Sequence, residues 1–310
     1  MKIKDLVVGT NATINLVIKT AAVKTTKSNK PYLSLDLFDG CDSIQANCWD
    51  WYKDEIPKKN EVFAITAAVG EWAGNKQLTI KTLTLNTSAG IEEFAPRGDV
   101  DINACVQDAK DLIECIEHQG LHDVVLKIFK DNAARWRTVP GAKSVHHAYV
   151  GGTLQHSVET AKKAKAIAEL IPTCDVSLCI AGALLHDLGK LWTYNLEGVV
   201  IDYTLDGESM EHISLGAVKL VEYMTPENEQ ALWVLQHIIL SHHGVLEHGS
   251  PVTPHFLEAW VVHYADAIDA RTATVRELNA KAPAGATHTE KSWVLGCAMF
   301  TQELIHSKLR

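Results

Sequence analysis

The spacing of hydrophobic residues changes from a period of two to a helical period near residue 100, which predicts two differently built parts. Apolar and polar residues alternate through Tyr32–Phe38, and the segment stops at the turn sequence Asp39-Gly40. Such alternation is typical of a strand with one buried face. Four further segments of this kind begin near residues 13, 43, 62 and 77. Five short strands in roughly 75 residues predict a small antiparallel barrel or sandwich.

The remainder of the chain has the periodicity of amphipathic helices. Asp175 is a predicted N-cap for the helix that ends at Leu185. Helices are expected at 102–119, 121–136, 152–171, 176–185, 213–224, 227–241, 254–280 and 290–309. We therefore expect an α+β protein, in which a small β-barrel precedes an all-α bundle. The predicted boundaries are 1–87 for the barrel, 88–100 for a Pro- and Gly-containing linker, and 101–310 for the helical domain.

Composition restricts the class of protein. The seven cysteines are scattered, odd in number and free of any Cys-x-x-Cys pair, which disfavours a disulfide framework and fits a reducing compartment. No apolar stretch is long enough to span a bilayer, and the first residues lack a secretory h-region. These features predict a cytoplasmic protein without a membrane partner. The net charge of −9 is unusual for a nucleic-acid-binding protein.

Lysines and aromatic residues gather in the predicted barrel. OB-folds bind single strands with cations along the backbone and rings beneath the bases. Five aromatic side chains look exposed in the sequence: Tyr32, Trp49, Trp51, Tyr52 and Trp72. The residues that we predict to contact nucleic acid are Lys24, Lys27, Lys30, Tyr32, Trp49 and Trp72. For each of them a structural role, as a core ring or a solvated loop lysine, is an equal alternative.

All histidines of the chain lie beyond residue 117, and several fall in an order that suggests a metal centre. The pair His186-Asp187 ends an apolar run, which would carry an ionised carboxylate into the interior unless a cation compensates it. His156 lies upstream, and His212, His242-His243 and Asp266 lie downstream. Imidazole and carboxylate ligands from separate helices can hold Mn²⁺, Fe²⁺, Co²⁺ or Zn²⁺, and Asp187 can bridge two such ions. Two bridged ions can activate water for attack on a phosphodiester.

The ordered set His156, His186-Asp187 and Asp266 resembles the signature of the HD-domain phosphohydrolases, and His212 and His242 resemble the subset with two metals. Several longer strings, together with the N-terminal barrel, are similar to the YhaM-type 3′-5′ exoribonucleases, in which an OB-fold precedes an HD domain. The strings that carry this resemblance are Ser144–His156, Leu184–Lys190, Glu211–Gly216, Leu240–Gly244 and Gly249–Val252. The resemblance covers nearly the whole chain.

The resemblance implies a metal-dependent exonuclease that removes nucleoside 5′-monophosphates from the 3′ end of single-stranded RNA, and of DNA as an open alternative. It implies two divalent ions, typically Mn²⁺, with Fe²⁺, Co²⁺, Mg²⁺ and Zn²⁺ as alternatives. The first would be held by His156, His186, Asp187 and Asp266, and the second by Asp187, His212 and His242. His243 is then a ligand or a substrate contact. Besides Asp187, the catalytic candidates are Lys190, facing the developing phosphoryl charge, and His147 or its neighbour His146 near the phosphate.

The sequence is also compatible with structural roles for some of these residues and with two other functions. Lys190 is equally a helix C-terminal charge, and Asp269 is either a partner that orients a metal ligand or half of an ordinary ion pair with Arg271 or Arg276. One rival function is an HD phosphohydrolase acting on a small nucleotide or a cyclic dinucleotide. The other is a nucleic-acid-binding protein with an inert HD domain, which the complete ligand set disfavours. A homo-oligomer would concentrate the lysines around the active site, and the sequence leaves the oligomeric state open.

Overall fold

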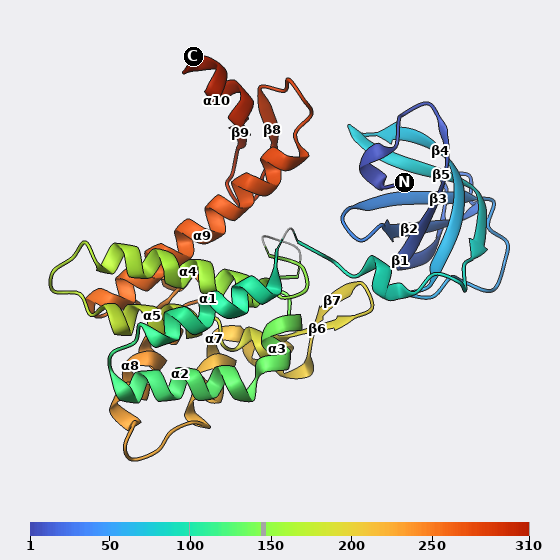
Figure 1. Cartoon of the computed structure of the whole chain (residues 1–310). Coiled ribbons are helices and arrows are strands. Elements are labelled where there is room, and N and C mark those ends of the chain that lie inside the picture. Colours follow the sequence, from blue (N-terminus) through green and yellow to red (C-terminus); the bar gives the residue numbers. More distant parts are fainter. Residues whose placement is uncertain (99, 144–146, 310) are drawn as a thin grey trace. The chain divides into compact units, whose positions relative to one another are not determined.

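The computed structural model describes residues 1–98, 100–143 and 147–309 (Figure 1). The chain divides into two compact units. One consists of Met1–Arg97 with Leu196–Asp202, and the other of Gly98–Asn195 with Tyr203–Arg310. None of the helices among the described residues is long and apolar enough to cross a membrane.

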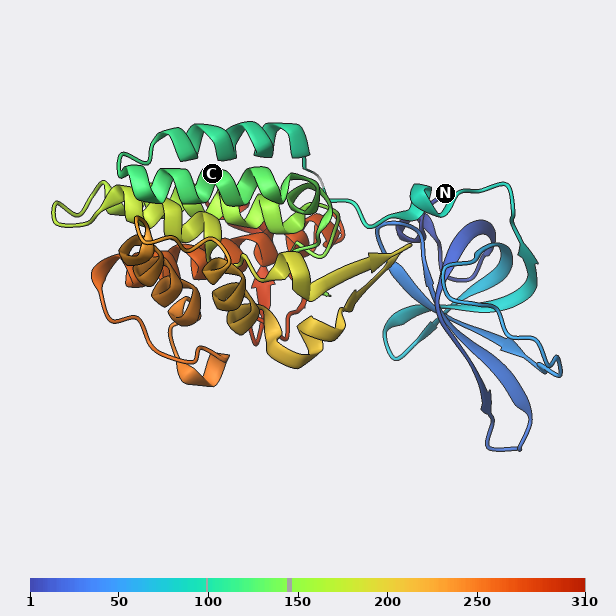
Figure 2. The same ribbon diagram turned by 90° about the horizontal axis from the view of Figure 1, so that it is seen from below.

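The first unit is built on a closed five-stranded barrel. Its strands are β1 (Asn11–Thr25), β2 (Pro31–Phe38), β3 (Ser43–Trp49), β4 (Val62–Trp72) and β5 (Asn75–Leu85). They close in the order β1-β2-β3-β5-β4, with β3 and β5 parallel and the other pairs antiparallel. Figure 2 shows the barrel from another side, in blue to cyan. This is the Greek-key order of an OB-type barrel. Alternate residues such as Leu33, Leu35 and Leu37 are fully buried and form the core, as their spacing predicts.

The second unit is mainly helical. Its helices are α1 (Ile102–Glu114), α2 (Gln119–Asp131), α3 (Ala133–Thr138), α4 (Gly152–Ala168), α5 (Val176–Leu185), α6 (Lys190–Thr193), α7 (Leu205–Val221), α8 (Glu229–Ser241), α9 (Leu257–Lys281) and α10 (Gln302–Lys308). The hairpin β8 (His288–Lys291) and β9 (Ala298–Phe300) precedes α10. The hairpin β6 (Tyr194–Glu197) and β7 (Val200–Tyr203) follows α6 in the chain, and its residues Leu196–Asp202 belong to the first unit. The predicted fold class, a barrel followed by a helical region, is confirmed.

Helix α5 lies in the middle of this unit because it is apolar on every side. Seven consecutive residues, Cys179–Leu185, are buried, and α4, α8 and α9 pack around them. The Asp175 carboxylate accepts a hydrogen bond from the Leu178 backbone N–H at 2.9 Å and so caps the helix as predicted. The C-terminal end of α5 therefore delivers His186 and Asp187 to the centre of the bundle.

The prediction of one helix over 290–309 is wrong. The structure has the β8–β9 hairpin there, followed only by the short helix α10. Gly296 adopts a φ of 74° in the turn, which a helix does not accommodate. The Thr289 hydroxyl accepts a hydrogen bond from the Met299 N–H at 3.0 Å across the hairpin, and Thr301 caps α10. The apolar residues of this segment have a helical spacing, but the positive φ of Gly296 favours a turn between two strands.

Candidate metal centre

The predicted ligands come from five separate segments and meet inside the helical unit. His156 lies in α4, His186 and Asp187 directly follow α5, and His212 lies in α7. His242 and His243 directly follow α8, and Asp266 lies in α9. The side chains of His156, His186, Asp187 and His242 are almost completely buried, whereas Asp266, His212 and His243 are partly accessible. The structure therefore brings the whole predicted ligand set together.

The first cluster consists of atoms that all carry lone pairs. His156 Nε2 lies 3.3 Å from Asp187 Oδ2, 3.1 Å from Asp266 Oδ1 and 3.1 Å from His186 Nε2. The Nδ1 atom of His186 donates to the Ala183 carbonyl at 2.7 Å, and the Nδ1 atom of His156 donates to Asp269 Oδ2 at 2.7 Å. In the neutral rings both Nε2 atoms are then acceptors. Four acceptors at this separation, in a buried site, call for a cation between them.

The pKa values agree with that requirement. Burial by itself would lower the pKa of His156, but its hydrogen bonds to Asp187 and Asp266 hold it well above the usual value. Burial would raise the pKa of Asp187, whereas Lys190 and His186 hold it well below. The centre thus keeps an ionised carboxylate and attracts positive charge to His156 Nε2, where a divalent ion can replace a proton.

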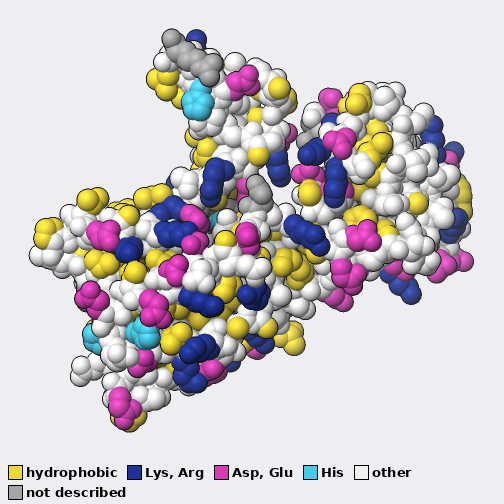
Figure 3. All heavy atoms as spheres, in the orientation of Figure 1, with side chains coloured by type: hydrophobic (Ala, Val, Ile, Leu, Met, Phe, Trp, Pro, Cys, Tyr) yellow, Lys and Arg dark blue, Asp and Glu magenta, His cyan; other side chains and the backbone are white. Residues whose placement is uncertain are grey.

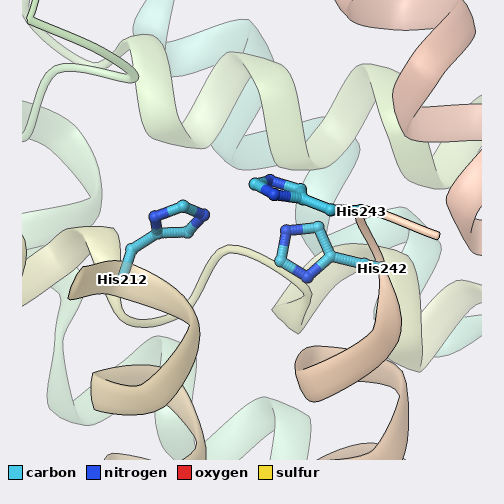
Figure 4. Close-up of side chains that lie close together, drawn as sticks. All are labelled: His212, His242 and His243. Carbon is cyan, nitrogen blue, oxygen red and sulfur yellow. The ribbon is translucent and has the colours of Figure 1, made fainter. Parts of the chain in front are cut away.

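A second cluster, on the other side of Asp187, contains buried polar atoms that have no hydrogen-bond partner among the described residues. Its unsatisfied buried atoms are Asp187 Oδ1, His212 Nε2 and His242 Nε2. The two nitrogens lie 3.5 Å and 3.6 Å from that oxygen. His243 completes the group, because its ligand atom lies within 4.8 Å of those of His212 and His242 (Figure 4). Unpaired buried polar atoms are costly, so their convergence is best explained by a bound ion.

His212 and His242 are neutral imidazoles, the form that binds metals. Burial lowers the pKa of His212 to about 3 and that of His242 well below its ordinary value. His242 Nδ1 donates to the Ile239 carbonyl at 2.7 Å, which leaves its Nε2 as the acceptor. Glu211, next to His212, has a φ of 55° and interrupts α7. Such a conformation is strained for a non-glycine residue and gives His212 a direction that an unbroken helix would not.

Lys190 lies at the centre as well. Its Nζ is 2.6 Å from Asp187 Oδ2, and its side chain retains a small exposed fraction of 12%. This position supports a role at the centre. It is equally compatible with the alternative role, in which the ammonium interacts with the dipole at the C-terminal end of the preceding helix. The lysine is one turn after the ligand pair, as the sequence predicts.

Gly189 allows the turn after Asp187 to pack on the backbone of α7. A Cβ atom at this position would lie 1.9 Å from the His212 carbonyl oxygen and 2.5 Å from the Gly216 nitrogen. Gly189→Ala should therefore push α6 away from α7 and weaken Mn²⁺ binding about tenfold or more, since small displacements of ligands are costly. Isothermal titration with Mn²⁺ would measure this effect. Gly70→Ala, in the barrel with only an ordinary 3.7 Å contact, is the control; unaltered Mn²⁺ affinity in Gly189→Ala would contradict the packing argument.

A third group of polar side chains adjoins the first cluster. Asp269 Oδ2 accepts hydrogen bonds from His156 Nδ1 at 2.7 Å and from His147 Nε2 at 3.0 Å. His147 Nδ1 also lies 2.9 Å from the Tyr149 hydroxyl. The predicted catalytic residue His147 is thus buried with both ring nitrogens engaged, while its alternative His146 lies outside the described residues. Only the position of Asp269, three residues after Asp266 on α9, hinted at this group in the sequence.

The predicted nucleic-acid residues of the barrel are divided between two places. Lys24, Tyr32 and Trp49 are direct partners across β1, β2 and β3, so they share one face. The rings of Tyr32 and Trp49 are in contact, with centroids 4.9 Å apart, and Trp49 is 48% exposed. Lys27 and Lys30 are exposed in the adjoining turn, although Lys30 lies 3.9 Å from Asp50.

Two other aromatic residues lie elsewhere. Trp72 is exposed but pairs with Asn75, and the β3–β5 register puts it about 20 Å along the strands from Trp49 at ~3.3 Å per residue. Trp51 was expected to be exposed, and that expectation is wrong: only 8% of it is accessible, and it packs in the barrel core. The reason is that the chain turns inward after Asp50, whose φ is 56°.

Comparison with known proteins assigns the helical site to a class. Residues 153–271 match the HD domain family, and this segment contains His156, His186, Asp187, His212, His242, His243 and Asp266. The chain therefore contains an HD domain, which indicates a metal-dependent phosphohydrolase, preceded by an OB-type barrel.

Three solved structures show weaker likenesses. A crystal structure of a domain of replication protein A from Methanococcus maripaludis is 24% identical, covers 27% of this chain and 92% of its own, and has a TM-score of 0.25. The solution structure of the second OB-fold domain of replication protein A from the same organism is 20% identical, covers 29% of this chain and 97% of its own, and has a TM-score of 0.25. A crystal structure of a putative aspartyl-tRNA synthetase from Leishmania major Friedlin is 12% identical, covers 53% of this chain and 39% of its own, and has a TM-score of 0.20. These values are too low to bear on function, and the class of the barrel follows from its own strand order.

Proposed function

We propose that this protein is a metal-dependent 3′-5′ exonuclease that hydrolyses single-stranded RNA to nucleoside 5′-monophosphates. The observation that carries the proposal is the position of Asp187 between two ligand clusters: Oδ2 faces His156 and His186, and Oδ1 faces His212 and His242. A carboxylate shared in this way is suited to bridge two divalent ions. Polarity toward the 3′ end and the preference for RNA rest on the resemblance to YhaM-type enzymes.

The donor set fits divalent metal ions. We propose that His156, His186, Asp187 and Asp266 hold one ion and that Asp187, His212 and His242 hold the other, with His243 as a further ligand or a substrate contact. Mixed imidazole and carboxylate ligands suit Mn²⁺, Fe²⁺, Co²⁺ and Zn²⁺ better than Mg²⁺, and Mn²⁺ is our first choice. When bound, such ions polarise the phosphodiester and lower the pKa of water.

The chain's own residues supply orientation and charge. The Lys190 ammonium is held at Asp187 and remains partly accessible, so it can donate to a phosphoryl oxygen and stabilise its developing charge without transferring a proton. The buried histidines surrounding Asp187 exclude bulk water from the carboxylate. All seven cysteines are free, which supports a reducing, cytoplasmic environment for such an enzyme.

A single strand needs a binding surface, and the barrel offers one. Lys24, Tyr32 and Trp49 form a row that combines a cation with two contacting rings. Rings of this kind stack with bases of any sequence, and the cation neutralises phosphate. On the face drawn in Figure 3, Lys and Arg side chains are interspersed with Asp and Glu over both units, so the net charge of −9 forms no single acidic field there.

Trp49→Ala should weaken binding of a single-stranded oligonucleotide by about 5- to 150-fold, because stacking contributes ~1–3 kcal/mol per base. Fluorescence anisotropy with a labelled 12-mer, in Ca²⁺ or without metal to prevent turnover, would measure the dissociation constant. Trp293→Ala is the matched control, since Trp293 is an exposed tryptophan of the helical unit. Equal losses in the two variants would remove the barrel row from the proposal.

The proposed reaction is tested with 5′-labelled single-stranded RNA, a DNA version and Mn²⁺, with products resolved at single-nucleotide resolution. A ladder shortening from the 3′ end, with release of 5′-monophosphates, is the expected result. Intact RNA in a protein that binds two Mn²⁺ ions would overturn the exonuclease proposal and favour hydrolysis of a small nucleotide or cyclic dinucleotide. A protein that binds no Mn²⁺ would point to an inert domain.

A further inference from the structure

Asp269 is a completely buried carboxylate that does not belong to the proposed ligand set. It receives three hydrogen bonds. His147 Nε2 and His156 Nδ1 donate to Oδ2, and Lys163 Nζ donates to Oδ1 at 2.9 Å. A carboxylate that accepts from three donors is held as an anion. Two of these donors, on His156 and Lys163, lie in α4, and the third, on His147, lies in the segment before α4.

This anion determines which nitrogen of His156 is available. A carboxylate oxygen only accepts hydrogen bonds, so the 2.7 Å contact places the proton of neutral His156 on Nδ1. Nε2 is then the lone-pair atom, and it lies within 3.3 Å of Asp187 and Asp266 oxygens. Without the acceptor, the imidazole could change tautomer or rotate about χ2, and either change would misdirect the ligand atom.

His147 holds Asp269 in turn. Its ring nitrogens are bound to Asp269 and to the Tyr149 hydroxyl, which itself donates to Gln155 Oε1 at 2.6 Å. Its backbone has a φ of 61°, a strained conformation that the surroundings stabilise. The His147 carbonyl accepts hydrogen bonds from the N–H groups of Gly141 and Tyr149, each at 2.8 Å. Both the ring and the backbone of His147 are therefore committed to contacts inside the protein.

We propose that Asp269 is the positioning residue for the metal ligand His156, and that His147 braces Asp269 in place of contacting the substrate. The inference rests on the proposed metal centre and adds to it a chain of contacts from the segment before α4 to the ligand. Lys163 contacts Asp269 from the more exposed side, and its Nζ also lies 3.1 Å from a Glu159 carboxylate oxygen. Carboxylate partners of this kind typically contribute 10- to 100-fold to metal affinity.

The test compares Mn²⁺ binding of the full-length wild type with that of Asp269→Asn, by titration calorimetry and by the electron paramagnetic resonance signal of free Mn²⁺. We expect binding at one site to weaken about 10- to 100-fold in the variant. Excess Mn²⁺ should restore hydrolysis, which a loss of catalytic chemistry would not allow. Asp108→Asn is the matched control, because Asp108 pairs with Lys162 at 2.7 Å, beside Lys163 but away from the ligands.

A second variant separates the roles of His147. His147→Gln should weaken Mn²⁺ binding and leave kcat at saturating Mn²⁺ within a fewfold of wild type. If instead Mn²⁺ affinity is unchanged and kcat falls, His147 contacts the substrate and the bracing role is overturned. This variant also decides the question if Asp269→Asn does not fold. Wild-type affinity in folded Asp269→Asn would overturn the positioning role, whereas absence of Mn²⁺ binding in the wild type itself would remove the proposed metal centre.

Discussion

Asp187→Ala is expected to abolish hydrolysis and to leave oligonucleotide binding by the barrel unchanged. The substitution removes a carboxylate whose two oxygens face the two ligand clusters, with Oδ2 3.2 Å from His186 Nε2 and Oδ1 3.5 Å from His212 Nε2. It therefore disrupts both proposed ion sites at once. Divalent ions contribute several kcal/mol to transition-state stabilisation, so a loss of at least about 10³-fold in kcat/KM should result.

The measurement is release of 5′-monophosphate from single-stranded RNA across a range of Mn²⁺ concentrations, with anisotropy of a labelled oligonucleotide in parallel. Asp206→Ala provides the control, since it removes an acidic side chain from the first turn of α7 without touching the centre. Turnover retained by a Mn²⁺-loaded Asp187→Ala protein would eliminate this centre as the active site. Loss of oligonucleotide binding together with activity would instead indicate that the substrate is held at the HD domain.

Removal of divalent metal is expected to lower the melting temperature by about 5–10 °C as well as to stop hydrolysis. Acceptor atoms such as Asp187 Oδ1, His212 Nε2 and His242 Nε2 are buried without a partner among the described residues, and a cation relieves this cost. Metal at a hundred times its dissociation constant stabilises the folded protein by about 2.7 kcal/mol. For a unit of roughly 150–250 residues, each kcal/mol shifts the melting temperature by about 2–4 °C.

Differential scanning calorimetry of protein dialysed against a chelator, before and after Mn²⁺ is returned, would measure the shift. Asp187→Ala again supplies the comparison, because its melting temperature should hardly respond to either treatment. A wild-type protein whose melting temperature ignores both chelator and Mn²⁺ would contradict a metal centre built from these residues. A shift of equal size in wild type and variant would place the metal elsewhere.

The strands were predictable because alternation is a local property. β3 and β4 begin at Ser43 and Val62, as expected, since each residue's environment follows from its parity along the strand. The buried course of α5 was predictable as well, because an apolar run with an Asp175 cap leaves few alternatives. The 290–309 segment was not, since its apolar residues fit a helix while one glycine turn and threonine contacts favour a hairpin.

By itself, the sequence determined the two-part fold and the order of the proposed metal ligands, because the hydrophobic period and the positions of His and Asp are properties of the sequence. Only the tertiary structure decided how those residues divide around Asp187, and that Trp51 is buried beside the exposed Trp49. It also decided that Asp269 joins His156 to His147, although Asp269 lies 122 residues after His147 in the chain. Hydrogen bonds of this kind depend on the packing of α4 against α9, and no spacing within a sequence encodes the distance between two helices.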